Sequence, residues 1–196
     1  MRTGPQSSHM SKRLFVSVDL DGLGDAVAAV QDRFDGVSGL RLTDPGQAHV
    51  TLKFLGDTAP DRVADVVAAL EAAVEDSGVE PFEADIGGLG VFPSLSYISV
   101  VWVGVRDGQG GPELTALHEA IEDRTVAMGF DSEDHEFTPH ATIARMDHAG
   151  GKETVQNIVE NDDPDVGCLQ VTEIRLKESE RGPGGPTYRT VESVSL

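Results

Sequence analysis

Two stretches of the sequence carry the same polar pair inside an apolar, strand-like run, and this repetition constrains the fold more than any other feature. AHVTLKFLG begins at Ala48 and HATIAR begins at His140, and each contains His-x-Thr. In a β-strand the side chains of residues i and i+2 point to the same face, so His49 projects with Thr51, and His140 with Thr142. Two such strands facing each other present two imidazoles and two hydroxyls to one cleft.

The order of the predicted elements puts one of these strands in each half of the chain. Residues 13–20 alternate in hydropathy like a half-buried strand, and residues 23–34 have apolar side chains at helical spacing. A second helix, capped by Asp57 or Thr58, ends at Gly78. Strand–helix–strand–helix therefore occurs twice, which predicts an α+β protein of two similar lobes. The segment 80–93 is expected to be a strand followed by a glycine-rich bend. Further strands are expected at 97–105, 169–178 and 186–196, and helices at 114–128 and 151–161.

Length and composition indicate a globular chain. It has 196 residues, 39% of them hydrophobic, which is enough for a sizeable core. The first ten residues, MRTGPQSSHM, look like an expression-vector leader, so we expect a single bilobal domain over 11–196. No apolar run approaches a membrane span and no signal-peptide core follows the start, so we expect a cytoplasmic protein. Cys168 is the only cysteine, which excludes an internal disulfide.

The chain is strongly acidic. Its formal net charge is −19 at pH 7, and such a surface repels itself at low salt. We interpret this as adaptation to a high-salt cytoplasm, because the Debye length falls to about 3 Å at 1 M salt. The alternative is an acidic mesophilic protein without this adaptation to salt. The charge argues against a broad basic face for nucleic acid, but it allows a small anionic ligand in a local pocket.

The repeated His-x-Thr pair suits hydrolysis of a phosphodiester. One neutral imidazole can deprotonate a water molecule while the other, protonated, gives a proton to the departing oxygen. The threonine hydroxyls can donate hydrogen bonds to the non-bridging phosphate oxygens. The chain offers no carboxylate–histidine cluster at ligand spacing, so we expect no metal and no cofactor. The alternative is that each His is a satisfied sheet histidine and each Thr follows its strand propensity.

Five stretches together resemble one protein family. They are HVTLKFLG, GGLGVFP, VVWVGV, FTPHATIAR and ESERGPGGPTYRTV. The family is the RNA 2′,3′-cyclic phosphodiesterases, also called RNA 2′,5′-ligases, of the 2H phosphoesterase superfamily. The resemblance implies a bilobal fold with two antiparallel-type sheets facing a central cleft and helices on the outside. It also implies hydrolysis of RNA or nucleoside 2′,3′-cyclic phosphates to 2′-phosphomonoesters and, with the acidic composition, a halophilic archaeal source.

The resemblance also implies residue roles. His49 would give a proton to the leaving 3′-oxygen, and His140 would activate water. Thr51 and Thr142 would hold the phosphate, with Arg145 as a further phosphate contact. Arg145 lies five residues after His140, so strict alternation sends it to the opposite face. A bulge or the end of the strand has to redirect it.

Lys53 and Phe92 are two further candidates for substrate binding. Lys53 shares strand parity with His49 and Thr51, which makes it a second cation for the phosphate or else a surface lysine. Phe92 follows the glycine-rich segment and is a candidate to stack a nucleobase, or else a core residue.

Two other functions fit the same residues. Ligation of RNA ends through a 2′,5′ linkage is the reverse direction, in which the two histidines exchange roles. A nucleotide-binding module would keep the fold without turnover. The expected partner is an RNA end or a nucleoside 2′,3′-cyclic phosphate, with no membrane, and the chain is expected to be a monomer.

Overall fold

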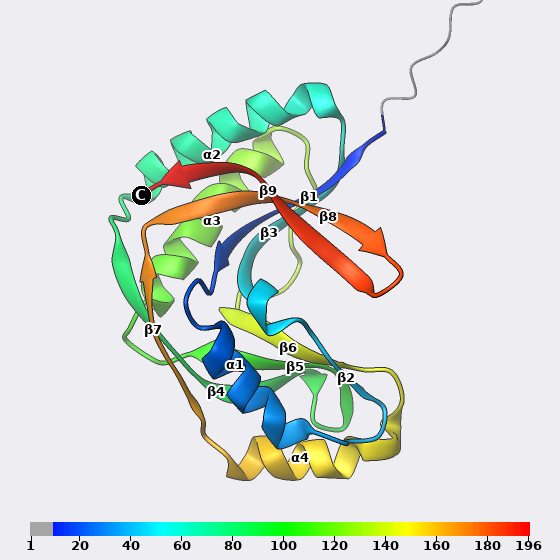
Figure 1. Ribbon diagram of the computed structural model, residues 1–196. Coiled ribbons are helices and arrows are strands. Elements are labelled where there is room, and N and C mark those ends of the chain that lie inside the picture. Colours follow the sequence, from blue (N-terminus) through cyan, green and yellow to red (C-terminus); the bar gives the residue numbers. More distant parts are fainter. Residues whose placement is uncertain (1–9) are drawn as a thin grey trace, which may run out of the picture.

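The computed structural model describes residues 10–196, which form nine strands and four α-helices (Figure 1). Residues 1–9, and with them almost all of the expected leader, lie outside this part. No helix of residues 10–196 is both long and apolar enough to cross a membrane. The strands are β1 (Lys12–Asp19), β2 (Leu40–Leu42), β3 (His49–Thr58), β4 (Phe82–Ser94), β5 (Tyr97–Val105), β6 (His140–Met146), β7 (Asp165–Val171), β8 (Glu173–Gly182) and β9 (Gly185–Ser195). The helices are α1 (Gly24–Gln31), α2 (Val63–Ser77), α3 (Gly111–Ala127) and α4 (Lys152–Asn161).

All nine strands belong to one antiparallel sheet, in the order β7-β4-β5-β6-β3-β1-β8-β9, with β2 also paired to β6. The pairing between strands is least extensive in the middle of the sheet, where β3 and β6 share a single residue pair, Val50 with Ala141. Further along β6, from Ala144 to Met146, β2 takes the place of β3. The sheet therefore divides into an upper half (β3, β1, β8, β9) and a lower half (β7, β4, β5, β6, β2), as Figure 1 shows. The α+β class is confirmed, and the two expected sheets are the halves of one curled sheet.

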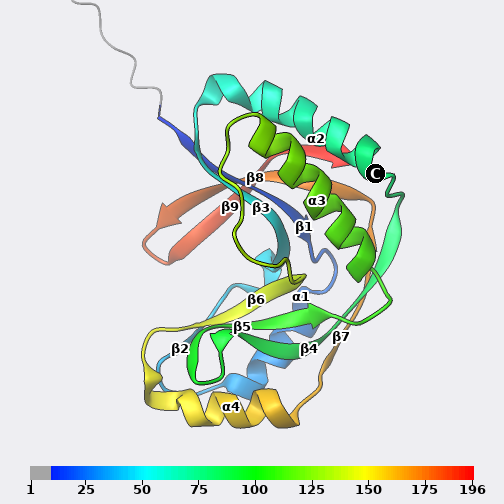
Figure 2. The ribbon, with the colours of Figure 1, turned by 180° about the vertical axis from the view of Figure 1, so that it is seen from behind.

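Helices cover the outer faces of both halves (Figures 1 and 2). In the upper half, α3 packs on β3, and α2 packs on α3 and β9. In the lower half, α1 packs on β6 and β7, and α4 packs on β4. The chain crosses between the halves, because α1 follows a strand of the upper half and α3 follows a strand of the lower half. Neither half is therefore a continuous segment of the sequence.

The apolar periodicity of the helices explains which faces are buried. In α2, Val66, Leu70 and Ala73 recur at helical spacing and have no exposed surface. The helix ends at Gly78, as expected, with a φ of 64° that glycine adopts without steric cost. The same periodicity operates in α3, so the two helices form a layer over the upper half of the sheet.

The structure corrects three local predictions. Neither Asp57 nor Thr58 caps α2, because both pair with β1 as part of β3. The expected glycine-rich bend is a continuous strand, β4, with a bulge at Gly88, whose φ is 75°. The strand expected at 169–178 is two strands, β7 and β8, separated by Thr172.

Candidate active site

The two His-x-Thr motifs meet where the halves of the sheet join. Their middle residues, Val50 and Ala141, form the single pair between β3 and β6, and each is 1% exposed. Because the strands are antiparallel, this pair sets each histidine beside the threonine of the other motif. His49 and His140, with their threonines, alternate with the buried residues and project to one side of the join. The motifs are therefore related by an approximate twofold axis.

A β-bulge follows each motif at the same position. In β6 the extra residue is Ile143, which interrupts the pairing with β5 between Thr142 and Ala144. The bulge reverses the alternation, so Arg145 returns to the face of His140 and is exposed. The bulge that Arg145 requires in order to reach the site is therefore present.

The bulge in β3 has the opposite consequence for Lys53. Leu52 is the extra residue, so Lys53 turns to the core and Phe54 turns to the face of the motif, where it is 68% exposed. The Lys53 side chain has no exposed surface, and its ammonium group donates to Glu122 and to the carbonyl of Asp131, each at 2.5 Å. The prediction that Lys53 offers a second cation to the phosphate is wrong, because the bulge breaks the alternation on which it rested.

Backbone carbonyls orient both imidazole rings and select their tautomers. Nδ1 of His49 lies 2.9 Å from the carbonyl oxygen of Gln47, and Nδ1 of His140 lies 2.7 Å from that of Thr138. A carbonyl oxygen only accepts hydrogen bonds, so Nδ1 carries the hydrogen in each neutral ring. Nε2 is therefore the nitrogen that can exchange a proton with a substrate in both histidines.

Aromatic rings shield His49 from water. The rings of Phe15 and Tyr188 each lie 5.1 Å from its imidazole. Burial lowers the pKa of His49, while the hydrogen bond to Gln47 and the negative charge of Asp19 act in the opposite direction. The net shift is downward, so the neutral ring is favoured more than in a solvated histidine.

Asp19 is the half-buried carboxylate of the site, and it is the direct partner of His49 across β1 and β3. It accepts hydrogen bonds from Ser17 at 2.8 Å, Lys177 at 2.6 Å and Arg175 at 2.8 Å. Burial alone raises the pKa of Asp19, but these three hydrogen bonds outweigh burial and lower it. Asp19 therefore stays ionised and stabilises the protonated form of its neighbouring imidazole.

Two aromatic side chains from β4 and β5 surround His140. The ring centroids of Phe92 and Trp102 lie 4.8 and 5.8 Å from its imidazole. Trp102 fits there because Gly90 has no side chain, since a Cβ at that position would overlap the indole. Burial lowers the pKa of His140, and the positive charge of Arg145 also lowers it. The predicted stacking residue, Phe92, thus lies at the site, half-buried against the second histidine.

Sequence reasoning missed four of these neighbours, namely Phe15, Asp19, Trp102 and Tyr188. The sequence pattern of β1 contained a signal for Phe15 and Asp19. Alternation places both on the face opposite the apolar side chains of that strand, and in the sheet this face continues the face of β3 that carries His49. Trp102 lies in a strand that is apolar on both faces, and Tyr188 comes from the last strand. Local patterns carry no signal for these two.

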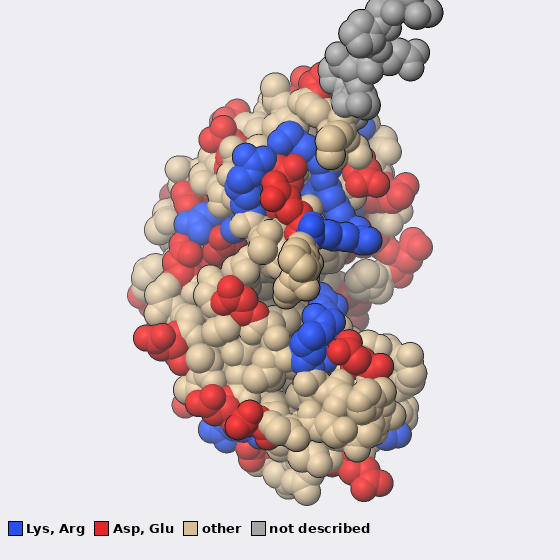
Figure 3. Space-filling view, turned by 45° about the vertical axis from the view of Figure 1, so that its right-hand side comes forward, with Lys and Arg blue, Asp and Glu red and all other residues tan. Residues whose placement is uncertain are grey.

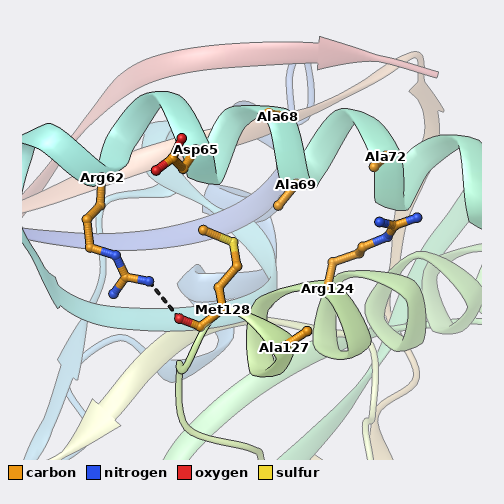
Figure 4. A pocket seen from close by; sticks show the side chains of 8 residues that line it. All are labelled: Arg62, Asp65, Ala68, Ala69, Ala72, Arg124, Ala127 and Met128. Atoms are coloured by element: carbon orange, nitrogen blue, oxygen red, sulfur yellow. Dashed lines mark hydrogen bonds between the residues drawn. The ribbon is translucent and has the colours of Figure 1, made fainter.

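A second hollow lies on the outer surface, in a groove between α2 and α3 (Figure 4). Both of its arginines are engaged: Arg62 donates to the carbonyl of Met128 at 2.8 Å, and Arg124 pairs with Asp76 at 2.6 Å. No histidine lines this groove, whereas both His-x-Thr motifs lie at the join of the halves. The groove is lined by Arg62, Asp65, Ala68, Ala69, Ala72, Arg124, Ala127 and Met128.

Within residues 10–196, no three His, Cys, Asp or Glu side chains gather as a metal site requires.

A curled α+β sheet whose central join carries two His-x-Thr strands defines a class of protein, and comparison with known families identifies that class. Residues 24–183 match the family described as the 2′-5′ RNA ligase superfamily. The chain belongs to this superfamily, as the resemblance of its motifs predicts.

Individual relatives cover most or nearly all of the chain. It is 36% identical over 193 residues to the RNA 2′,3′-cyclic phosphodiesterase of Methanothermobacter thermautotrophicus, covering 95% of this chain and 100% of the relative. It is also 36% identical over 156 residues to that of Aeropyrum pernix, covering 79% and 85%. Among solved structures, TT0787 of Thermus thermophilus matches with a TM-score of 0.76 and 26% identity over 94% and 97% of the chains. E. coli LigT complexed with 3′-AMP, at 21% identity, shares the fold with a TM-score of 0.75 over 95% and 98%.

Proposed function

We propose that this protein hydrolyses the 2′,3′-cyclic phosphate of an RNA end or a nucleoside to a 2′-phosphomonoester, without a metal ion. One observation carries the proposal: two histidines of the same tautomer project to one side of the single Val50–Ala141 pair. Such a pair provides a base and an acid for one phosphorus atom. The relatives named RNA 2′,3′-cyclic phosphodiesterase support the same reaction.

In this reaction His140 is the base and His49 is the acid. Nε2 of His140 takes a proton from water as the water oxygen bonds to phosphorus. Nε2 of His49 gives its proton to the 3′-oxygen as the bond from phosphorus to that oxygen breaks, which leaves a 2′-phosphate and a 3′-hydroxyl. The neighbouring charges support this assignment, because Arg145 favours the neutral form of His140, whereas Asp19 favours the protonated form of His49.

The remaining side chains of the motifs bind the substrate. The hydroxyls of Thr51 and Thr142 donate to the non-bridging oxygens, which gain negative charge in the transition state. Arg145 adds a guanidinium group, and it forms no salt bridge with any residue of 10–196 despite the net charge of −19. Phe92 contacts the nucleoside from its position beside His140.

The setting of the reaction belongs to the same proposal. The net charge of −19 supports a protein of a halophilic archaeon that works in a cytoplasm rich in salt. The same charge separates copies of the chain by mutual repulsion, which supports a monomer. No cofactor enters the mechanism, since proton transfer and hydrogen bonds to the phosphate are sufficient for it.

Ligation is the second candidate activity, and the name of the superfamily favours it. A 5′-hydroxyl of RNA then takes the place of water, and a 2′,5′ linkage forms as the bond to the 3′-oxygen breaks. The two histidines do not exchange roles, contrary to the expectation from the sequence, because the 5′-hydroxyl is deprotonated in the place of water and the 3′-oxygen is the leaving group in both reactions. High concentrations of a 5′-hydroxyl RNA would reveal this activity as a joined product.

The proposal is tested with the four nucleoside 2′,3′-cyclic phosphates in the presence of EDTA. The expected products are 2′-monophosphates, and His49→Ala and His140→Ala each lower kcat by at least about a hundredfold. His148→Ala, in the exposed loop after β6, is the matched control and keeps the wild-type rate. Formation of 3′-monophosphates, loss of activity in EDTA, or near-normal turnover in both motif variants would contradict the proposal. Tight binding without turnover would support a nucleotide-binding module instead.

A further inference from the structure

Five of the ten arginines among residues 10–196 lie close to a carboxylate oxygen. Of the other five, Arg41 and Arg145 belong to the lower half. Arg33 and Arg124, for example, lie 2.8 and 2.6 Å from aspartate oxygens, within the usual range of charged hydrogen bonds. Arg145 forms no salt bridge among residues 10–196, and Arg41 makes two long hydrogen bonds to Asp147, from Nε at 3.3 Å and from Nη2 at 3.4 Å. In a chain with 34 acidic and 15 basic residues, weakly paired guanidinium groups indicate a place kept for another anion.

These two arginines lie side by side. Arg41 of β2 and Arg145 of β6 are direct partners in the antiparallel pairing of the two strands. Directly opposed residues point to the same face of a sheet, with their Cα atoms about 4.5–5.5 Å apart. The bulge in β6 makes this the face of His140 and Thr142. Like charges in this position destabilise a sheet, so an anion bound between them would relieve the repulsion.

The Arg41 side chain can change partners while its strand stays in place. Arg41 and Asp147 are 54% and 56% exposed, and so open an ion pair contributes little to stability. The backbone after the strand is held firmly: Thr43 donates through Oγ1 to the carbonyl of Thr142 at 3.2 Å, and Gln31 donates to the carbonyl of Thr43 at 2.8 Å. A phosphate can therefore replace Asp147 without any change of the fold.

We propose that Arg41 binds a second phosphate of an RNA chain, the one that precedes the terminal nucleoside, while Arg145 contacts the cyclic phosphate. The proposal rests on the proposed function and names its substrate class as RNA ends rather than free nucleotides. Arginine suits this role because its planar fork matches the oxygens of a phosphate. In Figure 3, Lys and Arg side chains lie above and below the hollow between the two halves, with Asp and Glu side chains among them and over the rest of this face.

A nucleoside 2′,3′-cyclic phosphate has a single phosphate and cannot use both arginines, whereas an oligonucleotide with the same end can. The test therefore compares adenosine 2′,3′-cyclic phosphate with a short oligoadenylate that ends in a 2′,3′-cyclic phosphate, at one fixed KCl concentration. Arg41→Ala is expected to lower the ratio of kcat/KM for the oligonucleotide to kcat/KM for the nucleoside by about tenfold. Arg41→Lys, which keeps the charge but not the fork, is expected to recover part of this ratio.

Arg33→Ala is the matched control, because it also removes an exposed arginine of the lower half and changes the net charge equally. Its ratio is expected to change by less than about twofold, as for surface side chains away from a ligand. An unchanged ratio in Arg41→Ala, or an equal fall in both variants, would overturn the site.

Failure of the proposed function would look different from failure of this site. If the wild-type protein does not turn over adenosine 2′,3′-cyclic phosphate, the proposed function is contradicted. Binding of a fluorescent oligoadenylate ending in a 2′-phosphate then tests Arg41 alone. The expected result is a Kd about tenfold weaker in Arg41→Ala than in Arg33→Ala, and equal Kd values would overturn the site.

Discussion

The ammonium group of Lys53 lies 2.5 Å from Oε2 of Glu122, inside the upper half and directly after the bulge in β3. Oε1 of Glu122 accepts the backbone N–H of Glu133 at 2.8 Å, and Lys53 also donates to the carbonyl of Asp131. Asp131 and Glu133 belong to the loop that leads from α3 to His140. The ion pair therefore connects the strand of the first motif to the approach of the second.

Lys53→Met is expected to destabilise the protein, because it leaves the carboxylate of Glu122 without its counter-charge. We expect a loss of about 3 kcal/mol in the free energy of unfolding, the lower end of the range for buried pairs, since the Glu122 side chain is 19% exposed. Thermal unfolding should show a melting temperature about 10 °C lower. Lys152→Met is the control with the same change of charge, because Lys152 bonds only the carbonyl of Ser96 on the surface. Equal melting temperatures for the two variants would refute the structural role of the pair.

The pH dependence of hydrolysis follows from the burial of both histidines. Burial lowers the pKa of His49 and of His140 below the ordinary value of 6.5. The base has to be neutral, so kcat/KM rises as pH increases through the pKa of His140. The acid has to be protonated, so kcat/KM falls as pH increases through the pKa of His49. The maximum of the bell-shaped profile is therefore expected on the acid side of 6.5, and a maximum well above that value would be inconsistent with these roles.

Asp19→Asn is expected to move one limb of that profile. The negative charge of Asp19 acts against burial and raises the pKa of His49, so its removal lowers that pKa further and shifts the descending limb to lower pH. The ascending limb, which reports His140, should stay in place. Asp21→Asn is the control, because Asp21 also pairs with Arg175 but is not among the groups that shift the pKa of His49. A shift of both limbs in Asp19→Asn, or the same shift in Asp21→Asn, would contradict the assignment of the acid.

Salt is expected to stabilise this protein. Its net charge of −19 repels itself in dilute buffer, and molar KCl screens that repulsion over a few ångströms, with a Debye length of about 3 Å at 1 M. Melting temperature and the rate with a nucleoside 2′,3′-cyclic phosphate should both rise from dilute buffer to molar KCl. NaCl should act equally if screening is the cause. A melting temperature that falls with either salt would exclude the proposed adaptation.

Local patterns were sufficient to predict the class of fold and the central residues of the site. Alternation placed His49 with Thr51 and His140 with Thr142, and the structure retains that arrangement because no bulge falls between the members of either pair. Most elements also lie where the periodicity predicts them. β2 is an exception: it has only three residues and forms because β6 offers it a free edge.

The sequence alone determined which chemistry the site can support, since the spacing of two residues in a strand is sufficient to place an imidazole beside a hydroxyl. Which cation reaches that site depends instead on how the strands pair in the folded protein. Lys53 lies four residues after His49 and Arg145 lies five residues after His140. A bulge at the same place in each strand therefore turns Lys53 into the core against α3 and brings Arg145 out beside His140. The reason is physical: a bulge exists only relative to a partner strand, and the pairing of β1 with β3 and of β5 with β6 is a relation between distant segments. The alternation of side chains along a single strand contains no information about this pairing.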